Sequence, residues 1–249
     1  MVSTIVNTRT RQTVPGKWQY AINIGGGISN IVNGLFQNKP VLADAIGNTS
    51  SGGVTGPSNA VRPNDPSASG AFTAGLQVEK SIGKKWKFIS GLQYMYQSSV
   101  VKTGSRVDSS ATFNMGNGSI SADNFYLPGS MQRYRNKSHF LHVPLLFQFT
   151  LSKKYPAYVE AGPGISYLLR SNVLLYNSRR SAYYSNSEAF NNLLLSFTAG
   201  AGFELNRHKQ IPFRLGYRFS YGISSISKAS FGNQQLQASL LYLSIPIKK

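Results

Sequence analysis

The chain has 249 residues and no cysteine, and its 26 Lys and Arg residues against 8 acidic residues give a formal net charge of +18. Because it has no thiol, it makes no disulfide, thiolate metal site or thiol nucleophile. The positive charge indicates an anionic partner. It favours phospholipid or lipopolysaccharide, and not nucleic acid, because the basic residues fall in turns and loops between apolar segments.

Period-two alternation with many aromatic residues predicts eight β-strands. Each is about ten to fourteen residues long, which is enough for a tilted strand to cross a bilayer. No run of about 18 apolar residues occurs, so no transmembrane helix is predicted. In chain order the predicted strands cover about 17–29, 70–81, 86–97, 138–151, 157–170, 192–205, 211–223 and 235–247.

The connections between these strands alternate in length. Short basic turns follow the second, fourth and sixth strands, whereas the connections 30–69 and 98–137 are long. Short periplasmic turns and long extracellular loops are the rule in outer-membrane barrels. We therefore predict an all-β protein, an eight-stranded antiparallel up-and-down transmembrane β-barrel. Its basic periplasmic turns carry Lys84, Lys85, Lys153, Lys154, Arg207 and Lys209.

The even number of strands places both chain ends on the short-turn side. This divides the chain into a periplasmic N-terminal tail, residues 1–16, and an outer-membrane β-barrel domain, residues 17–249. Residues 1–6 do not resemble a secretory signal, because no basic region precedes an apolar core. Export therefore implies that a signal has been removed, or that the chain is an internal fragment.

The strand 211–223 shows which face is apolar. The glycines of its other face cover a water-exposed surface poorly but suit a narrow lumen, so we expect the apolar face to meet lipid. A soluble lipocalin-like barrel, with the apolar face inside, is the alternative. The outward face is predicted to carry Ile211, Phe213, Leu215, Tyr217, Phe219 and Tyr221, and the lumen face Pro212, Arg214, Gly216, Arg218, Ser220 and Gly222.

Two other strands provide predictions about which residues line the lumen. The lumen face of 157–170 is predicted to carry Tyr158, Glu160, Gly162, Gly164, Ser166 and Arg170. The strand 235–247 fits either orientation, because Leu236, Ala238, Leu240 and Tyr242 compete with Leu241, Leu243 and Ile245.

Four segments carry a resemblance to a known family. Residues 139–149, His-Phe-Leu-His-Val-Pro-Leu-Leu-Phe-Gln-Phe, resemble the Tyr-Leu-Glu-Ile-Pro-Leu-Leu-Leu-Lys stretch of the Bacteroidota PorT-like outer-membrane β-barrel family. Residues 160–169 resemble its Gly-Pro strand, 215–223 its Tyr-x-Tyr-Gly-Leu region, and 91–94 its third strand. The chain departs from the family at His142, usually acidic, and at Gln148, usually basic. The resemblance implies an eight-stranded barrel in the outer membrane of a Gram-negative bacterium, and some members assist protein secretion.

Charged residues on the predicted lumen face collect near the short turns. Buried charges are costly unless paired, so we expect them to form a salt-bridged plug. The alternative is a gated ion path, although an eight-stranded barrel is only wide enough inside for side chains. The predicted lumen charges are Glu79, Lys87, Glu160, Glu204, Arg214 and Arg218.

No catalytic residue, metal site or cofactor is predicted. His142 is expected on the lumen face, with Ser138 and His139 at the outer end of the same strand, and a lipid hydrolase would need a Ser–His–acid set at the lipid-accessible rim. His139 and His142 lie on opposite faces, so they cannot chelate one ion. The glycines 25–27 lie inside a strand and indicate a bend in the barrel, not a phosphate loop.

The leading hypothesis is a non-enzymatic outer-membrane anchor or accessory subunit of a larger assembly, such as secretion or transport machinery. A narrow transport channel, a lipid-modifying enzyme and a soluble ligand-binding barrel are the alternatives. The basic turns would touch headgroups or an acidic periplasmic protein. Outer-loop cations beside tyrosines would bind lipopolysaccharide phosphates or an outer-surface protein, and these residues are Arg133, Arg135, Lys137, Arg179 and Arg180, with Tyr134, Tyr183 and Tyr184.

Overall fold

The computed structural model describes residues 16, 18–33, 64–115, 118–151, 156–177, 180–205, 212–228 and 234–247. The predicted N-terminal tail, apart from Gly16, and the turn residues Lys153, Lys154, Arg207 and Lys209 lie outside these residues. Among the described residues, no helix has the length and apolarity needed to span a membrane.

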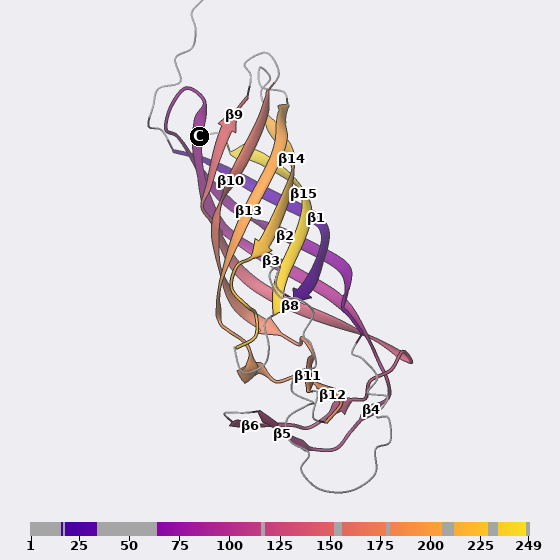
Figure 1. Cartoon of the computed structure of the whole chain (residues 1–249). Coiled ribbons are helices and arrows are strands. Elements are labelled where there is room, and N and C mark those ends of the chain that lie inside the picture. The colour runs from indigo at the N-terminus through magenta and orange to yellow at the C-terminus, as the bar shows by residue number, and fades with distance from the viewer. Residues whose placement is uncertain are drawn as a thin grey trace, which may run out of the picture.

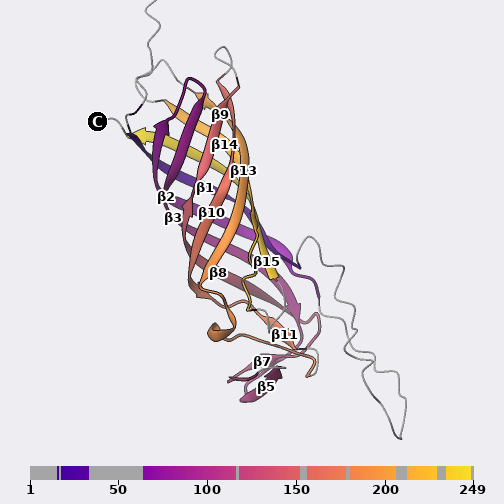
Figure 2. The same cartoon turned by 60° about the vertical axis from the view of Figure 1, so that its left-hand side comes forward.

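Antiparallel strands close into a barrel with an up-and-down order (Figures 1 and 2). Closure comes from β15, which pairs with β1 from Tyr20–Ile247 to Asn33–Gln234. Closure removes the free sheet edges, as it must in lipid, where an unpaired backbone N–H or C=O has no water to bond. The wall consists of β1 (Trp18–Asn33), β2 (Ser67–Ser81), β3 (Trp86–Thr103), β8 (Gln132–Pro144), β9 (Leu146–Thr150), β10 (Ala157–Ser171), β13 (Leu193–Leu205), β14 (Phe213–Gly222) and β15 (Gln234–Ile247).

The prediction of eight strands is confirmed, because β8 and β9 are two parts of one strand interrupted at Leu145. Both pair with β3 on one side and β10 on the other. At the interruption, the Leu145 N–H donates a hydrogen bond to the Pro163 carbonyl at 2.9 Å, so contact with β10 continues past the break.

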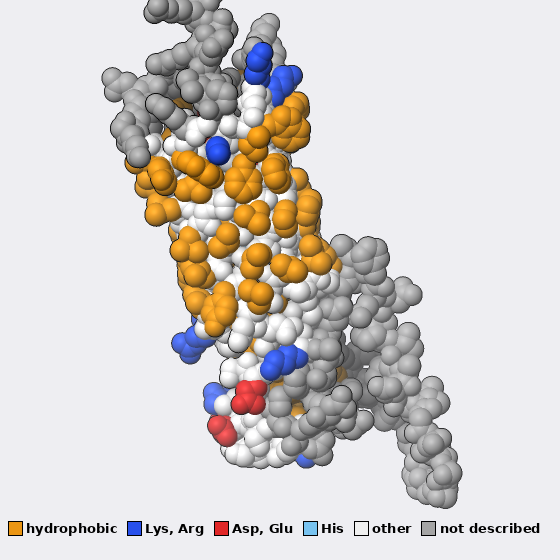
Figure 3. All heavy atoms as spheres, turned by 90° about the vertical axis from the view of Figure 1, so that its left-hand side faces the viewer, with side chains coloured by type: hydrophobic (Ala, Val, Ile, Leu, Met, Phe, Trp, Pro, Cys, Tyr) orange, Lys and Arg blue, Asp and Glu red, His pale blue; other side chains and the backbone are white. Residues whose placement is uncertain are grey.

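Large apolar side chains cover the outside of the barrel, as predicted. On β1, the outward-facing Ile24 is 49% exposed, whereas its inward neighbour Asn23 is fully buried. Figure 3 shows these apolar side chains gathered as a band across the face of the barrel that is in view. The orientation of the last strand, ambiguous in the sequence, is settled by Tyr242, which is buried, and Leu241, which is 64% exposed.

Several strands extend beyond their predicted loop-side ends. The connection predicted over 98–137 is shorter, because β3 continues to Thr103 and β8 begins at Gln132. Here the outward positions become polar or basic, as at Lys102 and Arg135, so the apolar alternation that marks a strand is lost although the backbone pairing continues.

The described loops carry structure of their own, at the end of the barrel away from the short turns (Figure 1). One small sheet has the order β11-β12-β7-β4, and β5 pairs with β6 as a hairpin. Two loops build the four-stranded sheet together, because β4 and β7 follow β3 whereas β11 and β12 follow β10. These elements are β4 (Arg106–Val107), β5 (Ala111–Met115), β6 (Gly118–Ala122), β7 (Phe125–Tyr126), β11 (Leu175–Asn177), β12 (Ala182–Tyr184) and the 3-10 helix η2 (Ser187–Ala189).

The prediction that Arg170 faces the lumen is wrong. The register between β10 and β8 shifts between Leu168 and Arg170, which places Arg170 opposite His139. A bulge of one residue reverses the faces of all later positions on a strand. Arg170 is therefore exposed on the outer wall.

A charge on the outward face tests the lipid-facing assignment. We expect Ile24→Arg to lower the free energy of unfolding by about 2–4 kcal/mol, because Ile24 lies near the middle of the apolar positions of β1. Ile28→Arg, at the loop-side border, should cost about 0–1 kcal/mol. Denaturant titration in phospholipid bilayers measures both, and equal small effects would contradict a membrane-facing band.

Candidate functional site

Arg214 of β14 is held inside the turn-side half of the lumen. It forms an ion pair with Glu79 of β2, from across the barrel, and both side chains are buried. Its guanidinium also donates hydrogen bonds to Gln148 Oε1 at 3.0 Å and to Ser244 Oγ at 2.9 Å. Side chains from three other strands thus converge on this one cation.

A second ion pair lies four residues further along β14. Arg218 Nε donates to Glu160 Oε1 at 2.5 Å and Arg218 Nη2 to Glu160 Oε2 at 3.2 Å, which is a two-pronged charge-assisted contact. Tyr242 donates to Glu160 Oε1 at 2.9 Å, and its hydroxyl lies 2.6 Å from that of Tyr158. The Arg218 guanidinium also stacks over the Tyr242 ring, 3.8 Å from the centroid.

The third pair lies at the turn-side mouth. Lys87 Nζ and Glu204 Oε1 are 4.0 Å apart, and both side chains are partly exposed. The structure therefore brings the six predicted lumen charges together in three pairs. It adds partners that sequence reasoning missed, namely Gln148, Ser244, Tyr158 and Tyr242. Inward parity was the signal available for Tyr158 and Gln148, whereas the ambiguous strand 235–247 offered none for Ser244 and Tyr242.

Glycines on β13 make room for these large side chains. A Cβ on Gly202 would lie 2.6 Å from the Tyr158 hydroxyl, and one on Gly200 would lie 3.1 Å from Glu160 Oε1. Because these inward-facing glycines of β13 have no side chain, they leave room for the side chains of Tyr158 and Glu160 on the neighbouring strand.

The two histidines lie on opposite faces of the strand, as predicted. His142 is buried in the lumen with its Nδ1 2.8 Å from Ser166 Oγ, and within the described residues no carboxylate hydrogen-bonds to it. His139 lies on the outer wall, where its Nδ1 is 2.6 Å from the Tyr94 hydroxyl. Among the described side chains, no three metal-ligating residues gather.

An apolar cluster lies at the loop-side end of the barrel. Inward side chains of the barrel wall pack there against residues from three loops, so wall and loops share one core. The wall contributes Ile31, Met95, Phe140, Leu168 and Leu194, and the loops contribute Phe113, Ala122, Val173, Leu175, Ala182, Tyr184, Ala189, Phe190 and Ile226.

Two tyrosines of β12 in this loop region are buried. Burial raises the pKa of Tyr184 to about 12. Burial also raises the pKa of Tyr183 to about 12, against the opposing effect of a hydrogen bond from the Asn64 N–H. Both hydroxyls therefore stay neutral at physiological pH. The ring of Tyr184 stacks on Phe113 with centroids 4.4 Å apart.

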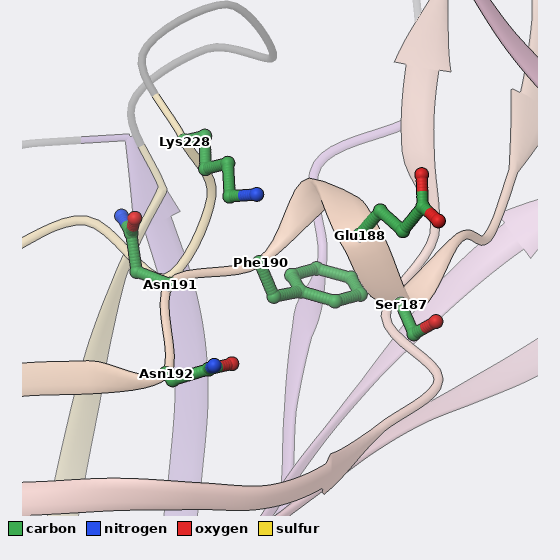
Figure 4. Close-up of a pocket in the computed structure, with 6 residues that line it drawn as sticks. All are labelled: Ser187, Glu188, Phe190, Asn191, Asn192 and Lys228. Atoms are coloured by element: carbon green, nitrogen blue, oxygen red, sulfur yellow. The ribbon is translucent and has the colours of Figure 1, made fainter.

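An open hollow of about 370 Å³ lies where η2 and the residues after it meet the loop that follows β14. Figure 4 shows Glu188 and Lys228 on opposite sides of Phe190, with the amides of Asn191 and Asn192 nearby. Asn191 Nδ2 is already used, since it donates to the Ser225 and Ser227 carbonyls. The hollow is lined by Ser187, Glu188, Phe190, Asn191, Asn192 and Lys228.

Comparison with known proteins identifies the family. Residues 10–228 match the family described as outer membrane protein beta-barrel domain. The chain belongs to this family. No curated protein sequence matches it.

Solved structures similar to the chain include those of three bacterial proteins. Neisserial surface protein A is 10% identical, with a TM-score of 0.42 over 91% of this chain and 96% of that one. OprG from Pseudomonas aeruginosa is 11% identical, with a TM-score of 0.34 over 92% and 96%. The attachment invasion locus protein Ail of Yersinia pestis is 10% identical, with a TM-score of 0.27 over 93% and 100%.

Membership in the outer membrane protein beta-barrel family implies the outer membrane of a Gram-negative bacterium. The family match rests on the sequence of residues 10–228, which is most of the chain, and not on these low structural similarities. It agrees with the closed barrel and the apolar outer band described above.

Removing one partner of a buried ion pair tests the lumen network. We expect Glu160→Ala to lower the free energy of unfolding by about 3–5 kcal/mol, because the Arg218 guanidinium stays buried without its counter-charge. Replacing both partners, as in Glu160→Gln with Arg218→Met, should cost less than the single change. Denaturant titration in micelles compares them, and a larger loss in the double variant would contradict this account.

Proposed function

We propose that the chain is a non-enzymatic anchor or accessory subunit of a larger outer-membrane assembly, such as secretion or transport machinery. The observation that carries the proposal is the filled lumen. Three ion pairs occupy its turn-side half and the shared apolar cluster closes its loop side. A barrel closed in this way offers its two ends and its outer wall for function.

The proposal includes the orientation of the barrel in the membrane and its place among outer-membrane barrel families. Long structured loops on one side and short turns on the other favour periplasmic termini, because outer-membrane barrels keep their short turns in the periplasm. The Gly-Pro and Pro-Leu-Leu motifs favour the PorT-like group of the Bacteroidota, some of whose members assist secretion. The burial of His142 in the lumen favours a non-enzymatic role.

The turn residues Lys84 and Lys85 are exposed and provide a test. We expect the protein, extracted from its own membrane in mild detergent, to migrate on native gels as a complex larger than the monomer. Lys84→Glu with Lys85→Glu should weaken that complex if the turns meet an acidic partner, because both charges are reversed. Lys84→Arg with Lys85→Arg keeps the charge and serves as the control. A wild-type protein that migrates as a monomer would contradict the subunit role.

A narrow channel is the second candidate, favoured by amides inside the lumen. Within the described residues, both polar atoms of the Asn23 side chain and the Nε2 atoms of Gln77 and Gln93 are buried without a hydrogen-bond partner. Such groups suit a hydrated path, because buried polar atoms normally find a partner.

Planar-bilayer recording separates the two candidates. The closed scaffold predicts no steady conductance in the wild type, and none in Phe113→Ala, because the ion pairs still fill the turn-side half. Discrete channel openings in the wild type would overturn the scaffold in favour of the channel.

A further inference from the structure

Five cations lie together on the outer wall of the barrel, at the loop-side ends of β3, β8 and β10. All are exposed, and the strand register places them on the outward face. We call this surface the basic strip, and it consists of Lys102, Arg133, Arg135, Lys137 and Arg170.

The pairing of the strands fixes the layout of the basic strip. Arg133, Arg135 and Lys137 occupy successive outward positions of β8, about 7 Å apart. Lys102 of β3 is directly opposite Arg133, and Arg170 of β10 is opposite His139, one outward position beyond Lys137. The cations therefore form a column with a flanking charge at each end.

The basic strip begins where the apolar band stops. The next outward position of β8 toward the short turns is His139, which contacts Tyr94 and lies 5.2 Å from the ring of Tyr96. One outward position further toward the short turns, Leu141 of β8 and its partner Tyr167 of β10 are exposed apolar residues. An aromatic belt beneath a row of cations is the order expected at the border of hydrocarbon and headgroups.

The cations of the basic strip have no acidic partner within the described residues. None of the five forms a salt bridge there, and Asp65, just before the start of β2, pairs with none of them. By contrast, Arg106 in the loop region is paired with Asp108 at 2.7 Å. Figure 3 shows basic side chains at the loop-side border of the band and acidic ones further out.

We infer that the basic strip binds the headgroup of an outer-leaflet glycolipid that carries more than one phosphate, of the lipid A type. Arg presents paired donors that match phosphate oxygens, and a column of three cations fits several phosphates better than one. Continuity with the apolar band favours a lipid over a protein, because a bound lipid places its acyl chains against Leu141 and Tyr167. The inference rests on the proposed orientation, with the loops facing outward.

Binding is tested with the refolded full chain in zwitterionic micelles, where membrane sidedness plays no part. Native mass spectrometry measures the binding of bisphosphorylated lipid A, dephosphorylated lipid A and phosphatidylglycerol. One surface cation near a phosphate contributes about five-fold in affinity. We therefore expect Arg133→Gln with Arg135→Gln to weaken lipid A binding by about 20- to 30-fold.

The control is Arg106→Gln with Lys228→Gln, which removes the same charge from the loop region. It should leave lipid A affinity within about two-fold, and a gel shift on heating checks that each variant is folded. Equal losses in the two variants, or equal binding of dephosphorylated lipid A, would overturn the inference. If phosphatidylglycerol binds as tightly as lipid A, and Arg133→Gln with Arg135→Gln weakens its binding equally, the glycolipid is not the specific ligand of the basic strip. Failure here leaves the native-gel test of the subunit role unaffected.

Discussion

The closed hydrogen-bonded wall is the constraint on which the rest of this structure depends. In lipid an unpaired backbone polar group costs several kcal/mol, so the sheet must return to its first strand. The pairing of β15 with β1 achieves this closure. Eight strands then leave an interior only wide enough for side chains, and the sequence has to fill it.

How the lumen is filled follows from the positions of its charges. Arg214 and Arg218 point inward from one strand and need counter-charges from others, which Glu79 and Glu160 supply. Gln148 and Ser244 accept further hydrogen bonds from Arg214, and Tyr242 donates one to Glu160. This arrangement joins strands that are not neighbours in the wall and ties the barrel together across its diameter.

The period-two alternation was sufficient to predict the wall, because lipid on one side and a packed lumen on the other impose opposite chemistry on successive residues. The prediction from this alternation failed beyond the apolar band, where lipid no longer covers the outward face. Beyond the band, polar or basic residues such as Lys102 and Arg135 take outward positions of β3 and β8, so the alternation did not predict these strand ends. The bulge near Arg170 left no mark in the sequence. The charged lumen residues were predictable from parity, whereas their pairing across the barrel and the core shared by three loops depend on three-dimensional closeness.

The shared loop core also has a consequence for assembly. Phe113, Phe190 and Ile226 come from three separate loops and meet on Phe140 and Leu194 of the wall. With the loops facing outward, as proposed above, none of these loops can complete its packing until the hairpins that carry the others have crossed the membrane. In that orientation the apolar loop residues cross the bilayer before they pack together, and the shared loop core forms only after all three hairpins are in place. A complete shared loop core therefore marks a chain whose strands have all been inserted.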